Sequence, residues 1–154
     1  MVAFPNSSCQ KAATLPLNLK RTLVVDDSAT ILHALCSLLE HHKIVDVVGR
    51  ASSGVDAVDS IQLLKPDLLL MDADMPGMSG LRASLVISQL HPDVRIILMS
   101  MDTGLRFVQA CLDCGAEAVV YKPRFLQQLA GILKAEAVAI QEPTVALKGA
   151  AGTI

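Results

Sequence analysis

Acidic residues stand in this sequence where two apolar runs end. The run LVV is followed by Asp26 and Asp27, and the run LLLM is followed by Asp72, with Asp74 two residues later. Because an ionised carboxylate is costly to bury, we expect these acids to lie where a buried strand meets solvent. Three carboxylates brought close together cannot all stay ionised without a cation, so the pattern predicts a metal site.

A hydroxyl and an ammonium group end two further apolar runs. RIILM ends in Ser100, and AVVY ends in Lys122, which Pro123 follows. Carboxylates are ligands for Mg²⁺, which often has a phosphate as its other partner. A lysine and a hydroxyl supply the donors that a phosphoryl group accepts. Acids, Mg²⁺, serine and lysine at one pocket would describe phosphoryl transfer with an aspartate as the nucleophile.

The elements that must position these residues alternate along the chain. Five apolar runs, each expected to form a strand, are TLVV, KIVDVVG, DLLLM, VRIILMS and EAVVYKP. Each is followed by a segment with helical periodicity, beginning SATIL, VDAVD, LRASL, TGLRF and RFLQQ. Ser79 is a plausible N-cap, Gly115 suits a left-handed residue after a helix, and Pro66 and Pro143 end helices.

Two of the predicted helices show clear apolar faces. We expect the first helix to bury one stripe and the second helix another. The stripe of the first is Ile31, Leu32, Leu35, Leu38 and Leu39, and that of the second is Val55, Val58, Ile61 and Leu64.

The strands predict a parallel sheet. Runs such as VRIILM do not alternate in polarity, which is typical of strands covered on both faces. Right-handed crossovers then place helices on both sides of the sheet. The fold class is therefore a doubly wound α/β fold over residues 20–140. We expect residues 1–19 to form a flexible extension and residues 141–154 a tail. In such sheets ligands bind beyond the carboxyl ends of the strands.

Four motifs together resemble the receiver domain of bacterial two-component response regulators. They are LVVDDS, PDLLLMDADMPGMSG, IILMS and GAEAVVYKP, and with the units between them they cover about four-fifths of the chain. The resemblance implies a flavodoxin-like sheet of five parallel strands in the order 2-1-3-4-5. It also implies that a histidine kinase, or a phosphotransfer protein, passes a phosphoryl group to this chain.

The resemblance assigns the acids to separate roles. Asp72 would be the phosphoacceptor. Asp27 would bind Mg²⁺ directly, Asp26 mostly through water, and Asp74 through its backbone carbonyl. The side chain of Asp74 would tune the lifetime of the phosphoryl group.

The same resemblance gives roles to the strand-end serine and lysine, and two positions depart from it. Ser100 would bond a phosphoryl oxygen and move toward it on activation, and Lys122 would pair with the phosphoryl group. The bond from Lys122 to Pro123 would be cis. Val119 stands where the family has an aromatic switch residue. Met101 follows Ser100 where a small residue is common, which predicts shielding of the phosphoryl group from water and its slow loss.

Composition excludes several other classes of protein. The net charge is −2, and the chain has one Tyr, three Phe and no Trp, so direct binding of nucleic acid is not expected. No uncharged run approaches the roughly 20 residues of a membrane span, and the start has no secretory layout. A cytoplasmic protein is expected. Cys111 and Cys114 have the spacing of half a zinc site, but core packing is the better interpretation.

The surface of the last helices leaves the oligomeric state open. Phe125, Ile132 and Val138 could form an apolar patch that supports a homodimer, or they could belong to the core. About 14 residues follow Ile140, too few for a further folded unit. We therefore expect either a stand-alone receiver with a downstream protein partner, or an output domain lost by truncation.

Two alternatives to the phosphoacceptor remain at this point. One is a receiver-like binding module that is never phosphorylated, which Val119 keeps open. The other is a phosphatase of the haloacid dehalogenase type, since Asp72 and Asp74 match its DxD motif. That family, however, carries the motif on its first strand, and it leaves Asp26 and Asp27 unexplained. We expect no enzymatic activity beyond self-phosphorylation from phosphodonors and autodephosphorylation.

Overall fold

The structure is a computed structural model that describes residues 19–141. Strands and helices alternate along this part of the chain. They are β1 (Arg21–Val25), α1 (Ala29–His41), β2 (Asp46–Ala51), α2 (Gly54–Leu64), β3 (Leu68–Asp72), α3 (Gly80–Leu90), β4 (Arg95–Ser100), α4 (Leu105–Asp113), β5 (Ala118–Tyr121), the 3₁₀ turn η1 (Lys122–Arg124) and α5 (Phe125–Gln141). The predicted extension, the tail and the helix end at Pro143 lie almost entirely outside the described residues.

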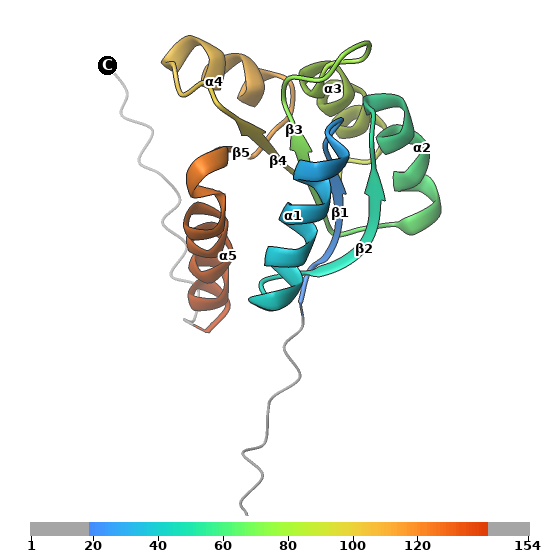
Figure 1. The fold of residues 1–154 in the computed structure, drawn as a ribbon. Coiled ribbons are helices and arrows are strands. Elements are labelled where there is room, and N and C mark those ends of the chain that lie inside the picture. The colour runs from blue at the N-terminus through green and yellow to red at the C-terminus, as the bar shows by residue number, and fades with distance from the viewer. Residues whose placement is uncertain (1–18, 142–154) are drawn as a thin grey trace, which may run out of the picture.

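The five strands form one parallel sheet in the order β2-β1-β3-β4-β5. Helices α1 and α5 cover one face, while α2, α3 and α4 cover the other (Figure 1). The predicted fold class and strand order are therefore confirmed. The central strand β3 is buried along its whole length, as its uninterrupted apolar run predicts.

Three of the helices begin at a serine. Ser28, Ser53 and Ser79 each accept a hydrogen bond through the side-chain oxygen from the backbone N–H three residues later. Such caps satisfy an N–H group that has no partner inside the helix. At the other end of α4, Gly115 has a φ of +91°, the left-handed conformation expected after a helix. Both capping predictions, at Ser79 and at Gly115, are confirmed.

Fewer residues of the predicted apolar stripes are buried than the sequence predicts. Ile31 and Leu38 are 41% and 39% exposed, and Val55 is 52% exposed. Of the predicted stripe of α1, Leu35 and Leu39 are buried, and Cys36 is buried beside them. The predicted stripe of α1 covered too wide an arc, and only its centre faces the sheet.

Two boundary features differ from the prediction. Strand β2 begins at Asp46 rather than at Lys43, because Lys43 has a φ of +50° and turns the chain out of α1. Residues 19–141 contain no cis peptide bond, so the expected cis bond before Pro123 is wrong. Lys122 and Pro123 instead form a helical turn that runs directly into α5. None of the helices in residues 19–141 is both long and apolar enough to cross a membrane.

Candidate functional site

Strand pairing brings the acids together at the carboxyl edge of the sheet. β1 and β3 are neighbours, and Val25 pairs with Met71, so the residues that follow these two stand side by side. The carboxylate groups of Asp26, Asp27 and Asp72 each offer an oxygen within 4.8 Å of the others. The structure thus shows that three carboxylates converge at the carboxyl ends of β1 and β3.

Lys122 reaches this cluster from the end of β5. Its Nζ lies 3.0 Å from Oδ2 of Asp26 and 3.2 Å from Oδ1 of Asp72. Asp26 and Asp72 are buried, whereas Asp27 is exposed. Two buried carboxylates therefore share one ammonium group, and the third carboxylate faces solvent.

The positive charge of Lys122 does not cancel the effect of burial on the pKa of Asp72. Burial raises the pKa of Asp72 above its usual range, although a backbone hydrogen bond and the charge of Lys122 act in the other direction. Burial alone would lower the pKa of Lys122, but the hydrogen bond to Asp26 and the charge of Asp72 raise it above its ordinary value. Negative charge is in excess at this edge, and a cation would relieve it.

Short local hydrogen bonds hold the two buried carboxylates in place. Oδ1 of Asp26 accepts from the backbone N–H of Ser28 at 2.9 Å, and Oδ1 of Asp72 accepts from the N–H of Asp74 at 3.2 Å. Ser28, not the Asp26–Asp27 pair, caps α1. The acids are therefore not needed as helix caps, which leaves them free for a ligand.

The loop after β3 packs tightly against the strand that carries Asp72. A Cβ atom at Gly80 would collide with the carbonyl oxygen of Asp72 and with the Cα atom of Ala73. The N–H of Gly80 also donates to the carbonyl of Ala73 at 3.0 Å. Only glycine lets α3 begin this close to the end of β3.

Ser100 is fully buried at the end of β4. Its Oγ accepts from the backbone N–H of Asp102 at 2.9 Å, and the carboxylate of Asp102 accepts from the N–H of Gly104 at 2.8 Å. The serine is thus linked through two hydrogen bonds to the start of α4. The hydroxyl still has its own hydrogen to donate.

The oxygen-rich cluster fits Mg²⁺ by its chemistry. Mg²⁺ takes oxygen ligands, prefers one or two carboxylates and keeps several waters. Asp26, Asp27 and Asp72 offer such oxygens, and the exposure of Asp27 leaves room for water. The side chain of Asp74 is exposed, and the role of its carbonyl stays a prediction.

The two positions that depart from the receiver pattern have different surroundings. Val119 is partly buried and packs against the core beneath α2, α3 and α4. Tyr121 lies two residues further along the strand and is also partly buried. Met101 is 62% exposed at the mouth of the site. The predicted shielding of the phosphoryl group by Met101 stays a prediction.

Other candidate residues prove to be structural. Cys111 and Cys114 are free thiols, and burial, with the nearby Cys114, raises the pKa of Cys111 to about 11. Such a thiol is a poor ligand and nucleophile at neutral pH. Phe125 is buried and Ile132 packs against the same core, so the core alternative holds for these two residues. The side chain of Val138 lies outside the described residues.

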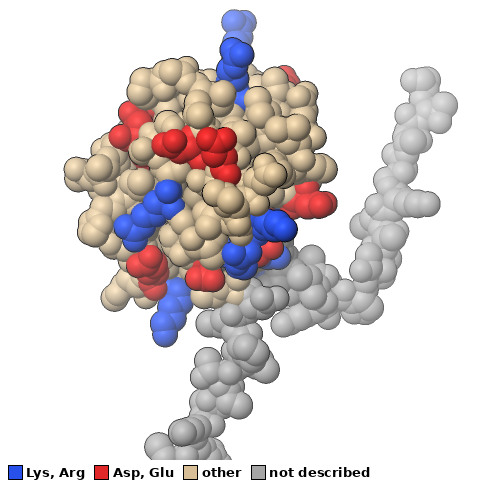
Figure 2. Space-filling view, turned by 90° about the vertical axis from the view of Figure 1, so that its right-hand side faces the viewer, with Lys and Arg blue, Asp and Glu red and all other residues tan. Residues whose placement is uncertain are grey.

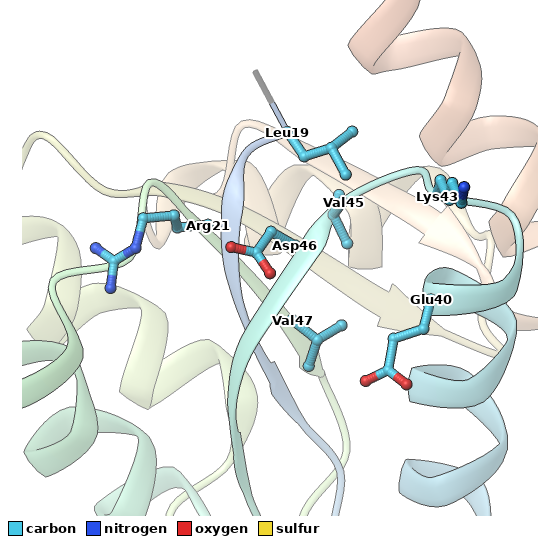
Figure 3. A pocket seen from close by; sticks show the side chains of 7 residues that line it. All are labelled: Leu19, Arg21, Glu40, Lys43, Val45, Asp46 and Val47. Atoms are coloured by element: carbon cyan, nitrogen blue, oxygen red, sulfur yellow. The ribbon is translucent and has the colours of Figure 1, made fainter. Parts of the chain in front are cut away.

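Two hollows lie at the opposite, amino edge of the sheet. One of about 610 Å³ is lined by Leu19, Arg21, Glu40, Lys43, Val45, Asp46 and Val47 (Figure 3). In Figure 3 the guanidinium of Arg21 points away from Glu40 and Lys43, and it donates to the carbonyls of Leu64 and Lys65 at the end of α2. A second hollow, of about 410 Å³, lies between the ends of α2 and α3. Neither includes a residue of the acid cluster.

The side of the molecule on which α2 lies carries charges of both signs. In Figure 2, which shows that side, Lys and Arg are interspersed with Asp and Glu.

Sequence reasoning did not single out two residues beside the site. Asp102 joins Ser100 to α4, and Gln128 accepts a hydrogen bond from the backbone N–H of Tyr121 at 2.6 Å. An acid two residues after a strand-end serine is a weak signal for such a turn. Nothing in the sequence signals the contact of Gln128, which depends on how α5 leaves β5.

The chain resembles known proteins in sequence. Residues 22–134 match the family described as the response regulator receiver domain. A protein-glutamate methylesterase/protein-glutamine glutaminase of Alkalilimnicola ehrlichii is 35% identical over 133 residues, which cover 86% of this chain and 34% of that protein. The response regulator GacA of Pseudomonas viridiflava is 32% identical over 109 residues, covering 71% of this chain and 51% of GacA. The chain spans about a third of the length of the methylesterases it matches.

Solved structures agree with these matches. The response regulator domain of CheB from Thermotoga maritima superposes with a TM-score of 0.67 at 30% identity, covering 82% of this chain and 99% of that one. The signal receiver domain of the putative response regulator NarL from Mycobacterium tuberculosis gives a TM-score of 0.70 at 26% identity, covering 78% and 97%.

Proposed function

Because this chain belongs to the response regulator receiver family, we propose that it accepts a phosphoryl group at Asp72 in a Mg²⁺-dependent step, with a histidine kinase or a phosphotransfer protein as the donor. One observation carries the proposal. Asp72 ends the buried strand β3 beside Asp26 and Asp27, and the Nζ of Lys122 already contacts it at 3.2 Å. Nucleophile, cation ligands and a positive charge for the phosphoryl group therefore occupy one edge.

The transfer is a displacement at phosphorus. An oxygen of ionised Asp72 forms a bond to phosphorus, the phosphorus–nitrogen bond of the donor's phosphohistidine breaks, and its electron pair returns to the imidazole. The product is an aspartyl phosphate. Lys122 lies where it can pair with the incoming phosphoryl oxygens, in place of one of its present carboxylate partners.

Asp26, Asp27 and Asp72 would hold Mg²⁺, together with the backbone carbonyl of Asp74. When bound, Mg²⁺ supplies neutralisation of the charge that collects on the phosphoryl oxygens. The buried carboxylates contribute fixed oxygen ligands because hydrogen bonds from the backbone hold Asp26 and Asp72. The excess negative charge of the edge supports the proposal that a divalent cation belongs there.

Ser100 is proposed to report the phosphoryl group to the surface. Its hydroxyl would donate to a phosphoryl oxygen and move toward it. Because Oγ of Ser100 also accepts from the N–H of Asp102, such a movement changes the turn that begins α4. The changed surface would then bind or release a partner protein or an output domain. The methylesterase and GacA relatives, which are longer than this chain, support an output that lies outside it.

The test is incubation with Mg²⁺ and acetyl phosphate. Wild type should gain a single phosphoryl group in an acid-stable, base-labile linkage, detected by intact mass, and Asp72→Asn should gain none. Omission of Mg²⁺ should prevent the gain. A wild type that stays unmodified would overturn the proposal and favour a receiver that acts by binding alone. Steady turnover of small phosphoesters would instead favour a phosphatase.

A further inference from the structure

We propose that Gln128 is a positioning residue for Lys122, an inference that rests on the proposed phosphorylation of Asp72. Gln128 touches neither the acids nor the place of the phosphoryl group. It acts through the backbone at the end of β5, from which Lys122 extends to the site.

The geometry at this point is unusual within the molecule. β5 is the edge strand of the sheet, and its last residue, Tyr121, pairs with Ser100 of β4. The helical segment that starts at Lys122 follows without a loop, so Tyr121 is at once the end of a strand and the N-cap of a helix. Its backbone N–H donates to Oε1 of Gln128 at 2.6 Å.

This hydrogen bond satisfies the N–H of the N-cap residue itself. Helices α1, α2 and α3 begin at serines, whereas Tyr121 makes no side-chain cap hydrogen bond. In a capping box, a Glu or Gln in the first turn reaches back to the N–H of the N-cap residue. Gln128 does the same from further along the helix, and so ties the first turns of α5 to the last residue of β5.

The hydrogen bond between Tyr121 and Gln128 lies next to Lys122, whose position matters most for the site. Lys122 has a flexible four-carbon side chain, and its Nζ must lie between Asp26 and Asp72. Its backbone directly follows the tethered N–H of Tyr121. Movement of this turn would displace the start of the long side chain and so draw the ammonium away from Asp26 and Asp72. Loss of the Gln128 contact should therefore lower the fraction of molecules with Lys122 in place.

The first experiment compares phosphorylation rates from acetyl phosphate at saturating Mg²⁺. Gln128→Ala should react about threefold to tenfold more slowly than wild type, within the coupling range of neighbouring residues. Gln128→Glu keeps an acceptor oxygen and should restore most of the rate. Gln127→Ala removes an exposed neighbour on the same helix and should leave the rate unchanged. An unchanged rate in Gln128→Ala would overturn the inference.

A double-mutant cycle separates positioning of Lys122 from a general structural effect. In a Lys122→Met background, Gln128→Ala should cause no further loss of rate, because the group it positions is gone. A loss as large as that in the wild-type background would overturn the inference. Failure of the proposed function looks different, since wild type itself would then gain no phosphoryl group.

Hydrogen exchange checks the same contact without phosphorylation. The amide of Tyr121 should exchange faster in Gln128→Ala than in wild type, and Gln127→Ala should match wild type. Equal exchange in all three proteins would overturn the inference whatever the phosphorylation rates. This readout also stands if Lys122→Met reacts too slowly to measure.

Discussion

Charged residues are paired differently at the amino edge and at the carboxyl edge of the sheet. At the amino edge, Arg95 pairs with Glu117 through two hydrogen bonds of 2.7 and 2.6 Å. Arg21 donates to the carbonyls that end α2, and its backbone N–H donates to the carboxylate of Asp67. At the carboxyl edge, Asp26, Asp27 and Asp72 converge, and the ammonium of Lys122 contacts Asp26 and Asp72.

The comparison shows that the fold accepts the energetic cost of buried carboxylates at its carboxyl edge. Arg95 and Glu117 of the amino edge form a partly exposed ion pair, as expected for groups that only stabilise the structure. The carboxyl edge buries two carboxylates beside one ammonium group, and burial raises the pKa of Asp72 although Lys122 acts in the other direction. Departures from local balance are expected at functional sites. Substitutions at the carboxyl edge and at the amino edge should therefore affect stability and phosphorylation differently.

The largest effect is expected from Asp72→Asn. The variant should lose phosphoryl acceptance completely and yet be more stable than wild type at neutral pH without Mg²⁺. The folded-state pKa of Asp72 lies above its unfolded value, so the carboxyl stabilises the fold while protonated, and this contribution is lost as the pH rises through the folded pKa. Urea unfolding across pH checks this. An Asn variant that is less stable at neutral pH would contradict the claim that burial of the ionised Asp72 carboxylate lowers the stability of the fold.

Lys122→Met should come next and should destabilise the protein. It leaves Asp26 and Asp72 buried without a counter-charge, which typically costs about 3–5 kcal/mol. Part of the loss should return in millimolar Mg²⁺, because a ligand that binds the folded state stabilises it. Thermal unfolding with and without Mg²⁺ is the measurement. Lys134→Met, at an exposed position of α5, is the control and should stay within about 0.5 kcal/mol of wild type.

A pair of glycine substitutions tests the packing of the carboxyl edge. Gly80→Ala should cost about 1–3 kcal/mol, because the new Cβ collides with the backbone of Asp72. It should also slow phosphorylation. At Gly131 a Cβ meets nothing within 4 Å, so Gly131→Ala in helix α5 should stabilise by about 0.5–1 kcal/mol. Similar unfolding free energies for the two variants would argue against tight packing at Gly80.

Glu117→Gln should have the smallest effect. Its pKa is lowered by the hydrogen bond to Arg95, so the ionised group stabilises the fold above its ordinary value of 4.5, and this contribution is lost as the pH falls through the folded pKa. The side chain is 43% exposed, and solvent screening should keep the loss below about 1 kcal/mol at neutral pH. Denaturation at neutral and acidic pH checks it. A difference that persists in acid would contradict the assignment.

Much of this arrangement could be predicted from residue types. Non-alternating runs such as that of β3 indicate a parallel sheet buried on both faces, and parallel strands carry their end residues to one edge. Asp26, Asp72, Ser100 and Lys122 lie at the predicted edge for that reason. The strand order came from the family resemblance, because periodicity does not say which strands are neighbours.

The errors arose where tertiary context decides. Ile31 and Leu38 are apolar but fall outside the arc of α1 that faces the sheet. The sequence could not decide between a surface patch and the core for Phe125, because the place where α5 meets the sheet is not visible in its own sequence. The bond before Pro123 depends on how directly α5 follows β5, and the contact of Gln128 depends on the same junction.

The contact between Asp26 and Lys122 has a consequence for folding. The two residues are 96 positions apart in the sequence, and Asp72 comes from a third strand between them. Such distant segments meet only after long loops have closed, which makes their pairing a late and slow event. A chain that has folded only its first two or three strands has no lysine beside its acids. The arrangement on which the proposed phosphorylation depends is therefore complete only when the whole domain has folded.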